Sequence, residues 1–279
     1  MPHIVDVLIE ERAEKLRQRP FVWRLVRTFL YPLIAYPRAV ALIDRVQPMS
    51  GQEIFDHLSD MLRLRMETHG LAWLPATGRA LVTPNHPAGI ADGIALYDAI
   101  KQVRRDVVFF ANRDAVRAAP NLVDSVIPVE WVEERRGHAR NKETVRHMVR
   151  AFREDRLVVI FPSGRLARPS FRGLIEREWT PTAVSLARKY ACPIVPAHIK
   201  ARNSWFYYLL YAVNTELKDM TLFRELINKQ RWKYRIRFGP GIDAGGNSDP
   251  AQLAAELRSF VTGPLAQGPA HFPAQSNRR

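Results

Sequence analysis

The sequence lacks a long hydrophobic run, and this absence argues against a membrane-spanning helix. The most apolar region, Phe21–Val46, is interrupted by Arg24, Arg27 and Arg38. Its longest uncharged run, Thr28–Pro37, holds 10 residues, whereas about 20 are needed to cross a bilayer. Arginines set among aromatic and aliphatic side chains suit a helix that lies in the membrane interface, and equally an ordinary amphipathic helix packed on the domain.

Cysteine is also scarce, because Cys192 is the only one and an internal disulfide is therefore excluded. Cys192 precedes Pro193 in an apolar run, which predicts a buried thiol rather than a reactive one. The N-terminal sequence, MPHIVDVLIEERAEK, carries acids early and lacks the apolar core of a secretory signal. We therefore expect a cytoplasmic protein, and no zinc site, since the histidines lack metal-ligand spacing.

Positive charge is what the sequence has in excess, with a formal net charge of +14 and a pI near 10.4. Such chains meet nucleic acid, anionic lipid headgroups or phosphorylated metabolites, or use the charge merely to stay soluble. A second aromatic run, Trp205–Tyr211, has the ring chemistry favoured at membrane interfaces, although it also suits a core. Together with Phe21–Val46 it favours a peripheral protein on the inner face of the cell membrane. A lipid surface is then the expected partner, and nucleic acid is not.

Short apolar runs alternate with helical patterns from Gly70 onward. Strands are predicted at Ala80–Thr83, Val107–Phe110, Val126–Val129, Leu157–Phe161, Ile194–Ile199 and, half-exposed, Lys233–Phe238. Helices are predicted at Gly93–Lys101, Lys142–Arg153 and Thr182–Tyr190. This alternation predicts an α/β fold with a mixed, largely parallel sheet flanked by helices.

The same pattern divides the chain into three parts. Residues 1–69, in which helical periodicity dominates, are predicted to form an N-terminal helical extension that associates with the membrane. Residues 70–263 carry the α/β domain. Residues 264–279, rich in proline, glycine, glutamine and asparagine, are predicted to form a disordered tail.

A histidine and an aspartate stand where a predicted strand gives way to a helix. The run ALVT leads into a loop with His86, and a helix begins near Ala91, with Asp92 in its first turn. Ligands and catalytic groups collect at the carboxyl ends of parallel strands. Asp92 would accept a hydrogen bond from one ring nitrogen and fix the tautomer, which leaves the other nitrogen to take a proton. The spacing also fits a His86 that caps the helix and an Asp92 in solvent.

The stretch GLAWLPATGRALVTPNHP resembles the start of the active-site region in the lysophospholipid acyltransferases. Their hallmark is an Asn-His pair followed by Asp, usually after four intervening residues. Asn85, His86 and Asp92 match it with five intervening residues (HxxxxxD), as in branches that carry a proline after the histidine. The resemblance covers roughly residues 70 to 242 and extends to the hemolysin-like branch, which includes acyltransferases that complete ornithine lipids.

Three further blocks resemble the family in the same order. The run Phe161–Arg165 (FPSGR) matches a block near the acceptor headgroup, with Ser163 in place of the usual glutamate. Arg113 falls in the region of a block whose basic residue binds the acceptor phosphate, and Pro196 matches a strand-end proline near the acyl donor. The resemblance therefore implies a substrate-binding set of Asn85, Arg113, Phe161, Pro162, Ser163, Gly164, Arg165 and Pro196.

The resemblance implies an O-acyltransferase of lipid metabolism that needs no metal or other cofactor. His86 would act as general base, oriented by Asp92, while the hydroxyl of a lysolipid attacks the thioester of acyl-CoA or acyl-carrier protein. The acceptor would be lysophosphatidic acid (1-acylglycerol 3-phosphate), another lysophospholipid or lyso-ornithine lipid. Arg165 would clamp its anionic group, or else be a solvated loop arginine. Because Ser163 replaces a glutamate, the alternative is a non-catalytic scaffold with a decayed acyltransferase fold that binds membrane or nucleic acid.

Overall fold

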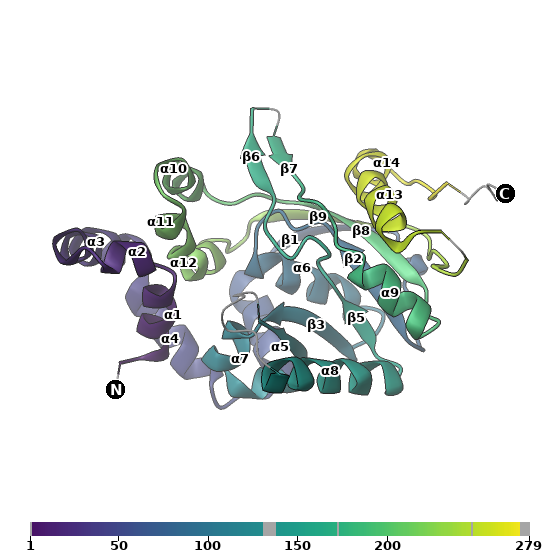
Figure 1. Cartoon of the computed structure of the whole chain (residues 1–279), viewed down its shortest axis with the longest axis horizontal. Coiled ribbons are helices and arrows are strands. Elements are labelled where there is room, and N and C mark those ends of the chain that lie inside the picture. The colour runs from purple at the N-terminus through teal and green to yellow at the C-terminus, as the bar shows by residue number, and fades with distance from the viewer. Residues whose placement is uncertain (1, 131–137, 172, 247, 274–279) are drawn as a thin grey trace.

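A seven-stranded sheet forms the centre of the computed structural model, which describes residues 2–130, 138–171, 173–246 and 248–273 (Figure 1). The strands, including the separate hairpin β6–β7, are β1 (Arg65–His69), β2 (Ala80–Pro84), β3 (Val107–Asn112), β4 (Val126–Val129), β5 (Leu157–Val159), β6 (Arg168–Ser170), β7 (Gly173–Ile175), β8 (Ile194–Lys200) and β9 (Lys233–Phe238). The order across the large sheet is β1-β9-β8-β2-β5-β3-β4.

Helices surround this sheet, and α1 to α5 all precede its first strand. Their bounds are α1 (Ile4–Glu11), α2 (Glu14–Arg17), α3 (Pro20–Leu33), α4 (Tyr36–Val46), α5 (Gly51–Leu62), α6 (Ile90–Ile100), α7 (Asp114–Ala118), α8 (His138–Arg153), α9 (Thr182–Lys189), α10 (Trp205–Val213), α11 (Thr215–Asp219), α12 (Leu222–Ile227), α13 (Pro250–Thr262) and α14 (Pro264–Gln267). Two short 3₁₀ turns, Leu71–Trp73 and Pro120–Asp124, complete the chain's regular structure among the described residues.

The sheet is mixed and largely parallel, as the sequence predicts. β2 pairs in parallel with β5 and β8, and β3 pairs in parallel with β4 and β5. β9 is antiparallel to β8 and parallel to β1. The carboxyl ends of β2, β3 and β5 therefore lie at the same end of the sheet, and the loops that carry the candidate residues begin there.

Apolar side chains cover both faces of the sheet, which explains why its strands read as uninterrupted apolar runs. In β2, Ala80 and Val82 belong to one core, together with residues of α1, α4, α5 and α6. Leu81 belongs to a second core, with residues of α8, α9 and α13. Successive side chains of a strand point to opposite faces, so the two cores lie on the two sides of the sheet.

The region Phe21–Val46 forms the two helices α3 and α4, and α3 carries an exposed apolar stripe. Phe21, Leu25, Phe29 and Leu33 are 42–73% accessible, and their spacing of four residues places them on one side of the helix. No helix in the described part of the chain combines the length and the apolar character needed to cross a membrane.

The aromatic run at 205–211 forms most of α10, which also exposes apolar side chains at every fourth position. Trp205, Leu209 and Val213 are 74%, 50% and 67% accessible. Figure 1 shows α3 and α10 on the same side of the molecule, away from the helices α8 and α13. The Glu216 carboxylate of α11 connects the two regions, because it accepts hydrogen bonds from the backbone N–H groups of Lys15 and Leu16 in α2.

Three elements differ from the expectation. The strand β1 lies within the predicted helical extension and pairs with β9 at the edge of the sheet. The hairpin β6–β7 falls in a stretch for which no strand is predicted, and it projects from the body of the molecule (Figure 1). The predicted tail, 264–279, begins with the helix α14, where Leu265 is fully buried against the second core; residues 274–279 lie outside the described residues.

Candidate active site

His86 and Asp92 form a direct hydrogen bond at the carboxyl end of β2. His86 Nδ1 lies 2.9 Å from Asp92 Oδ2. The same carboxylate oxygen accepts the backbone N–H groups of Ala88, at 2.7 Å, and Gly89, at 3.0 Å. The histidine side chain is 19% accessible, whereas that of Asp92 is completely buried. One oxygen of this buried carboxylate, Oδ2, is therefore the shared acceptor of the ring and of two backbone N–H groups.

The turn between β2 and α6 brings the pair together. Gly89 immediately precedes α6 and has φ 89° and ψ −137°, a conformation that glycine adopts at little cost and other residues rarely adopt. Asp92 then falls in the first turn of α6, where the free N–H groups of the helix favour a negative charge. The five-residue spacing of the motif is therefore compatible with direct contact between the two side chains.

This contact assigns the protons on the imidazole. Asp92 Oδ2 acts as an acceptor here, so His86 Nδ1 donates to it, and Nε2 is left without a proton in the neutral ring. A partly accessible Nε2 with a free lone pair is the arrangement that a general base requires. The ring also packs against Phe161, with 4.1 Å between the ring centroids, which fixes its plane.

The loop after β5 runs beside His86 and brings the second block into the site. Ala167 donates its backbone N–H to the His86 carbonyl at 2.8 Å. Ser163 is 9% accessible and donates its hydroxyl to the Arg165 carbonyl at 2.8 Å. Gly164, with φ 59°, donates its N–H to the Phe161 carbonyl at 2.9 Å, so this N–H is used within the turn.

Arg165 and Pro162 have opposite environments in this loop. The Arg165 side chain is exposed and makes no hydrogen bond or ion pair with any described residue, which leaves its guanidinium available to an anion. Pro162 is buried, and its carbonyl accepts from both the N–H and the hydroxyl of Thr180, each at 3.0 Å. The loop is therefore anchored on one side and presents a free cation on the other.

The Asn85 side chain is buried and forms hydrogen bonds with the backbone of β8. Its amide oxygen accepts the N–H of Ile199 at 2.7 Å, and its amide nitrogen donates to the Ile199 carbonyl at 3.0 Å. The side chain is 6% accessible. These contacts connect the end of β2 to the end of β8 and fix the position from which the His86 loop departs.

Two predicted residues have other partners in the structure. Arg113 follows β3 and forms an ion pair with Glu143 of α8. Pro196 is the third residue of β8, paired in register with Thr83, and so lies within the strand rather than at its end. The expected strand end is wrong because β8 continues to Lys200, where it pairs with β9.

Glu176 is the residue that the sequence analysis missed. Its carboxylate accepts the backbone N–H of His86 at 3.0 Å and the indole N–H of Trp179 at 3.2 Å. It is 7% accessible, and burial raises its pKa against the lowering effect of these donors. No sequence signal marked it, because the run Glu176-Arg177-Glu178 reads as a solvated charged segment.

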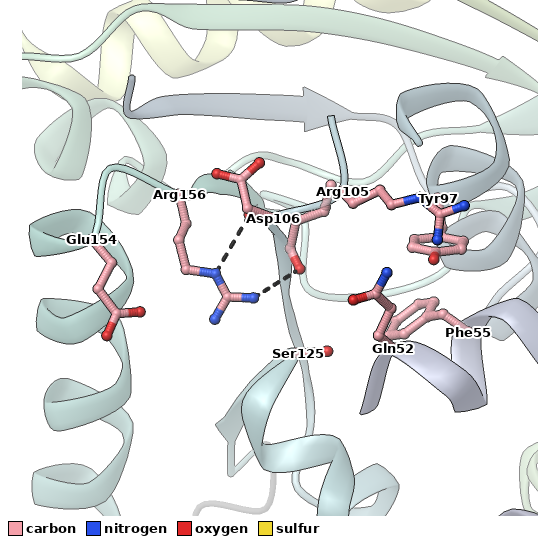
Figure 2. A pocket seen from close by; sticks show the side chains of 9 residues that line it. Gln52, Phe55, Tyr97, Arg105, Asp106, Ser125, Glu154 and Arg156 are labelled. Atoms are coloured by element: carbon pink, nitrogen blue, oxygen red, sulfur yellow. Dashed lines mark hydrogen bonds between the residues drawn. The ribbon is translucent and has the colours of Figure 1, made fainter. Parts of the chain in front are cut away.

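A cavity of about 500 Å³ lies away from this site (Figure 2). Its lining includes Asp106 and Val107 at the start of β3, Ser125 before β4 and Arg156 before β5. These are the amino ends of the strands, whereas His86 follows the carboxyl end of β2. Arg156 is occupied with carbonyl groups, including that of Asp124 at 2.8 Å. The cavity therefore lies at the amino ends of the strands, and the His86 site lies at the carboxyl ends.

Comparisons with known proteins find similarity to acyltransferases. The family model described as Acyltransferase matches residues 65–200. The chain is 23% identical to a lyso-glycine lipid O-acyltransferase of Phocaeicola vulgatus, over 92% of this chain and 93% of that protein. It is 21% identical to a lyso-glycine lipid O-acyltransferase of Bacteroides thetaiotaomicron, over 92% and 95% of the two chains.

A solved structure resembles the fold as a whole. The crystal structure of PlsC from Thermotoga maritima, a 1-acyl-sn-glycerophosphate (LPA) acyltransferase, superposes with a TM-score of 0.51 at 13% sequence identity. The superposition covers 94% of this chain and 95% of that one. The likeness therefore includes the N-terminal helices as well as the sheet.

Proposed function

We propose that the chain is a lysolipid O-acyltransferase of the lysophospholipid acyltransferase family, as the match of residues 65–200 to the Acyltransferase family model and the two lyso-glycine lipid O-acyltransferase relatives support. His86 is the general base, and Asp92 orients it. The observation that carries this proposal is the 2.9 Å contact between His86 Nδ1 and a fully buried Asp92 carboxylate. The pair lies where ligands collect in open α/β sheets, at the carboxyl end of a central parallel strand.

The reaction follows from the free lone pair on His86 Nε2. As the acceptor hydroxyl oxygen attacks the thioester carbonyl carbon, Nε2 takes the hydroxyl proton and the ring becomes an imidazolium. Asp92 stabilises that cation through Nδ1. The tetrahedral intermediate then expels the thiolate, and the proton on Nε2 passes to its sulfur. One C–O bond forms, one C–S bond breaks, and His86 returns to its neutral state.

The acceptor that we propose is a lyso-lipid with an amino-acid headgroup, a lyso-glycine lipid or its lyso-ornithine counterpart. The names of the two relatives that match nearly the whole chain support this choice. A glycine headgroup presents a carboxylate, and the exposed guanidinium of Arg165 offers two parallel donors to such a group. Lysophosphatidic acid is the second candidate, since the same guanidinium also suits a phosphate.

The enzyme reaches its acceptor at a membrane surface, through the exposed stripes of α3 and α10. Two exposed apolar stripes on one side of the molecule indicate a surface that binds a membrane or a partner. The exposed Arg24 and Arg27 lie on the same helix as the α3 stripe, at the level expected for anionic headgroups. The net charge of +14 adds a general attraction to such a surface. Residues 1–69 are then the membrane-associating part of the chain, except for β1, and the acyltransferase domain follows them.

A scaffold without activity is disfavoured by the same geometry. A protein that only binds membrane has no need for an ordered His–Asp pair with three donors on the carboxylate. The Ser163 substitution, which favours the scaffold, leaves that pair intact. A measurement of acyl transfer distinguishes the enzyme from the inactive scaffold.

The test is transfer of a radiolabelled acyl group from acyl-CoA and from acyl-carrier protein to lyso-glycine lipid, lyso-ornithine lipid and lysophosphatidic acid. We expect transfer by the wild type, with preference for the amino-acid lipids, and loss of at least a thousandfold in His86→Ala. His147→Ala, a histidine on α8, is the matched control and should retain full activity. Transfer that survives His86→Ala would remove His86 from the mechanism, and no transfer to any acceptor would favour the scaffold.

A further inference from the structure

A second carboxylate contacts His86, at its backbone rather than at its ring. Asp92 contacts the imidazole, whereas Glu176 Oε2 accepts the His86 backbone N–H at 3.0 Å. The other oxygen of Glu176 accepts the indole N–H of Trp179 at 3.2 Å. Each carboxylate oxygen is thus assigned to one donor, in a side chain that is 7% accessible.

Burying this carboxylate is costly, which makes its position informative. Transfer of an ionised carboxyl from water is unfavourable unless hydrogen bonds compensate for it. Burial accordingly raises the pKa of Glu176, while the hydrogen bonds from His86 and Trp179 lower it. The segment around Glu176 has a second anchor, because Thr180 donates to the Pro162 carbonyl.

We infer that Glu176, which lies beyond the β6–β7 hairpin in the sequence, is a positioning residue of His86. The inference rests on the proposed function, since it takes His86 to be the base. Glu176 holds the backbone of His86 at its N–H, while Ala167 holds it at its carbonyl. The ring is thereby kept at one position relative to Phe161 and Asp92 before the acceptor arrives.

Glu176→Gln tests this without changing the shape of the side chain. An amide has one accepting oxygen, so it can serve His86 or Trp179 but not both, and its NH₂ group then opposes the remaining donor. We expect kcat to fall by about 10- to 100-fold, as for loss of one charge-assisted hydrogen bond, with KM for donor and acceptor within twofold of wild type. Glu178→Gln is the matched control, because Glu178 is exposed on the same segment; it should leave kcat unchanged.

Should Glu176→Gln fail to fold cooperatively, Glu176→Asp takes its place, since its shorter carboxylate cannot reach both donors. A lowered kcat in the folded variant supports the inference, and a wild-type kcat with wild-type exchange at His86 overturns it.

Hydrogen–deuterium exchange gives a readout that does not depend on activity. Peptides containing the His86 amide should exchange faster in Glu176→Gln than in wild type or Glu178→Gln. Unchanged exchange together with wild-type kcat in folded Glu176→Gln would overturn the role of Glu176. If the wild type transfers acyl groups in a His86-dependent manner, that failure concerns the inference alone. If the wild type is inactive with every acceptor, the proposed function fails, and the exchange measurement still decides whether Glu176 holds His86.

Discussion

Replacement of Asp92 by asparagine removes one negative charge from the site and keeps the size of the side chain. The carboxylate is completely buried, so solvent does not screen its interaction with the His86 ring. During transfer the ring carries a positive charge centred about 4 Å from the carboxylate, and at an effective dielectric constant of about 20 that attraction is worth about 4 kcal/mol. Loss of this stabilisation in the transition state corresponds to about a thousandfold in rate.

The expected result is therefore a kcat lowered by about a thousandfold with KM values close to those of the wild type, because Asp92 does not contact the substrates. The measurement is steady-state acyl transfer at several concentrations of donor and acceptor. Asp98→Asn is the matched control, since Asp98 also lies on α6 and is ion-paired with Lys101; its kcat should change by less than threefold. If folded Asp92→Asn keeps more than a tenth of the wild-type kcat, the electrostatic account of the pair is wrong.

Three further changes test other parts of the molecule. Phe29→Ser should weaken cosedimentation with anionic vesicles by roughly tenfold or more, because burial of one aromatic ring is lost. The control Val145→Ser, on α8, should bind like the wild type. Equal binding of Phe29→Ser and the wild type would refute the α3 stripe as the membrane contact. Lys229→Met should lower the free energy of unfolding in urea by about 3 kcal/mol, because a completely buried ion pair loses one partner, and a loss under 1 kcal/mol would contradict this. Glu67→Gln should lower the melting temperature at pH 7: hydrogen bonds from Arg235 lower the Glu67 pKa to about 2, so its stabilisation is present above about pH 4.5 and is lost as the pH falls toward 2. A difference in melting temperature that persists at pH 2 would refute that assignment.

The His86–Asp92 contact could be predicted from the sequence because each part of it has a local signal. An apolar run predicts β2, the proline and glycine predict a turn, and Asp92 falls where a helix begins. Local signals of this kind depend on neighbouring residues only. The sequence also predicts that Arg165 lies at the same end of the sheet, because Arg165 comes after a second predicted strand.

Glu176 could not be predicted, since its role depends on contacts across the hairpin β6–β7. Both strands of that hairpin are only three residues long, so no alternation of apolar residues marks them. A glutamate between Ile175 and Arg177 has the composition of a surface segment. Only the three-dimensional path of the chain, which returns Glu176 to the backbone of His86, distinguishes it from its exposed neighbour Glu178.

The parallel pairing of β1 with β9 joins segments that are 168 residues apart, as in the contact between Glu67 and Arg235. During synthesis the ribosome releases the helices α1 to α5 long before β9 exists, and helices form from local contacts within microseconds. The sheet, in contrast, cannot be completed between β1 and β8 until residue 238 has emerged. The nascent chain therefore exposes the apolar stripe of α3 before the sheet is complete, and under the proposed function of that stripe, attachment to a bilayer can precede the appearance of activity.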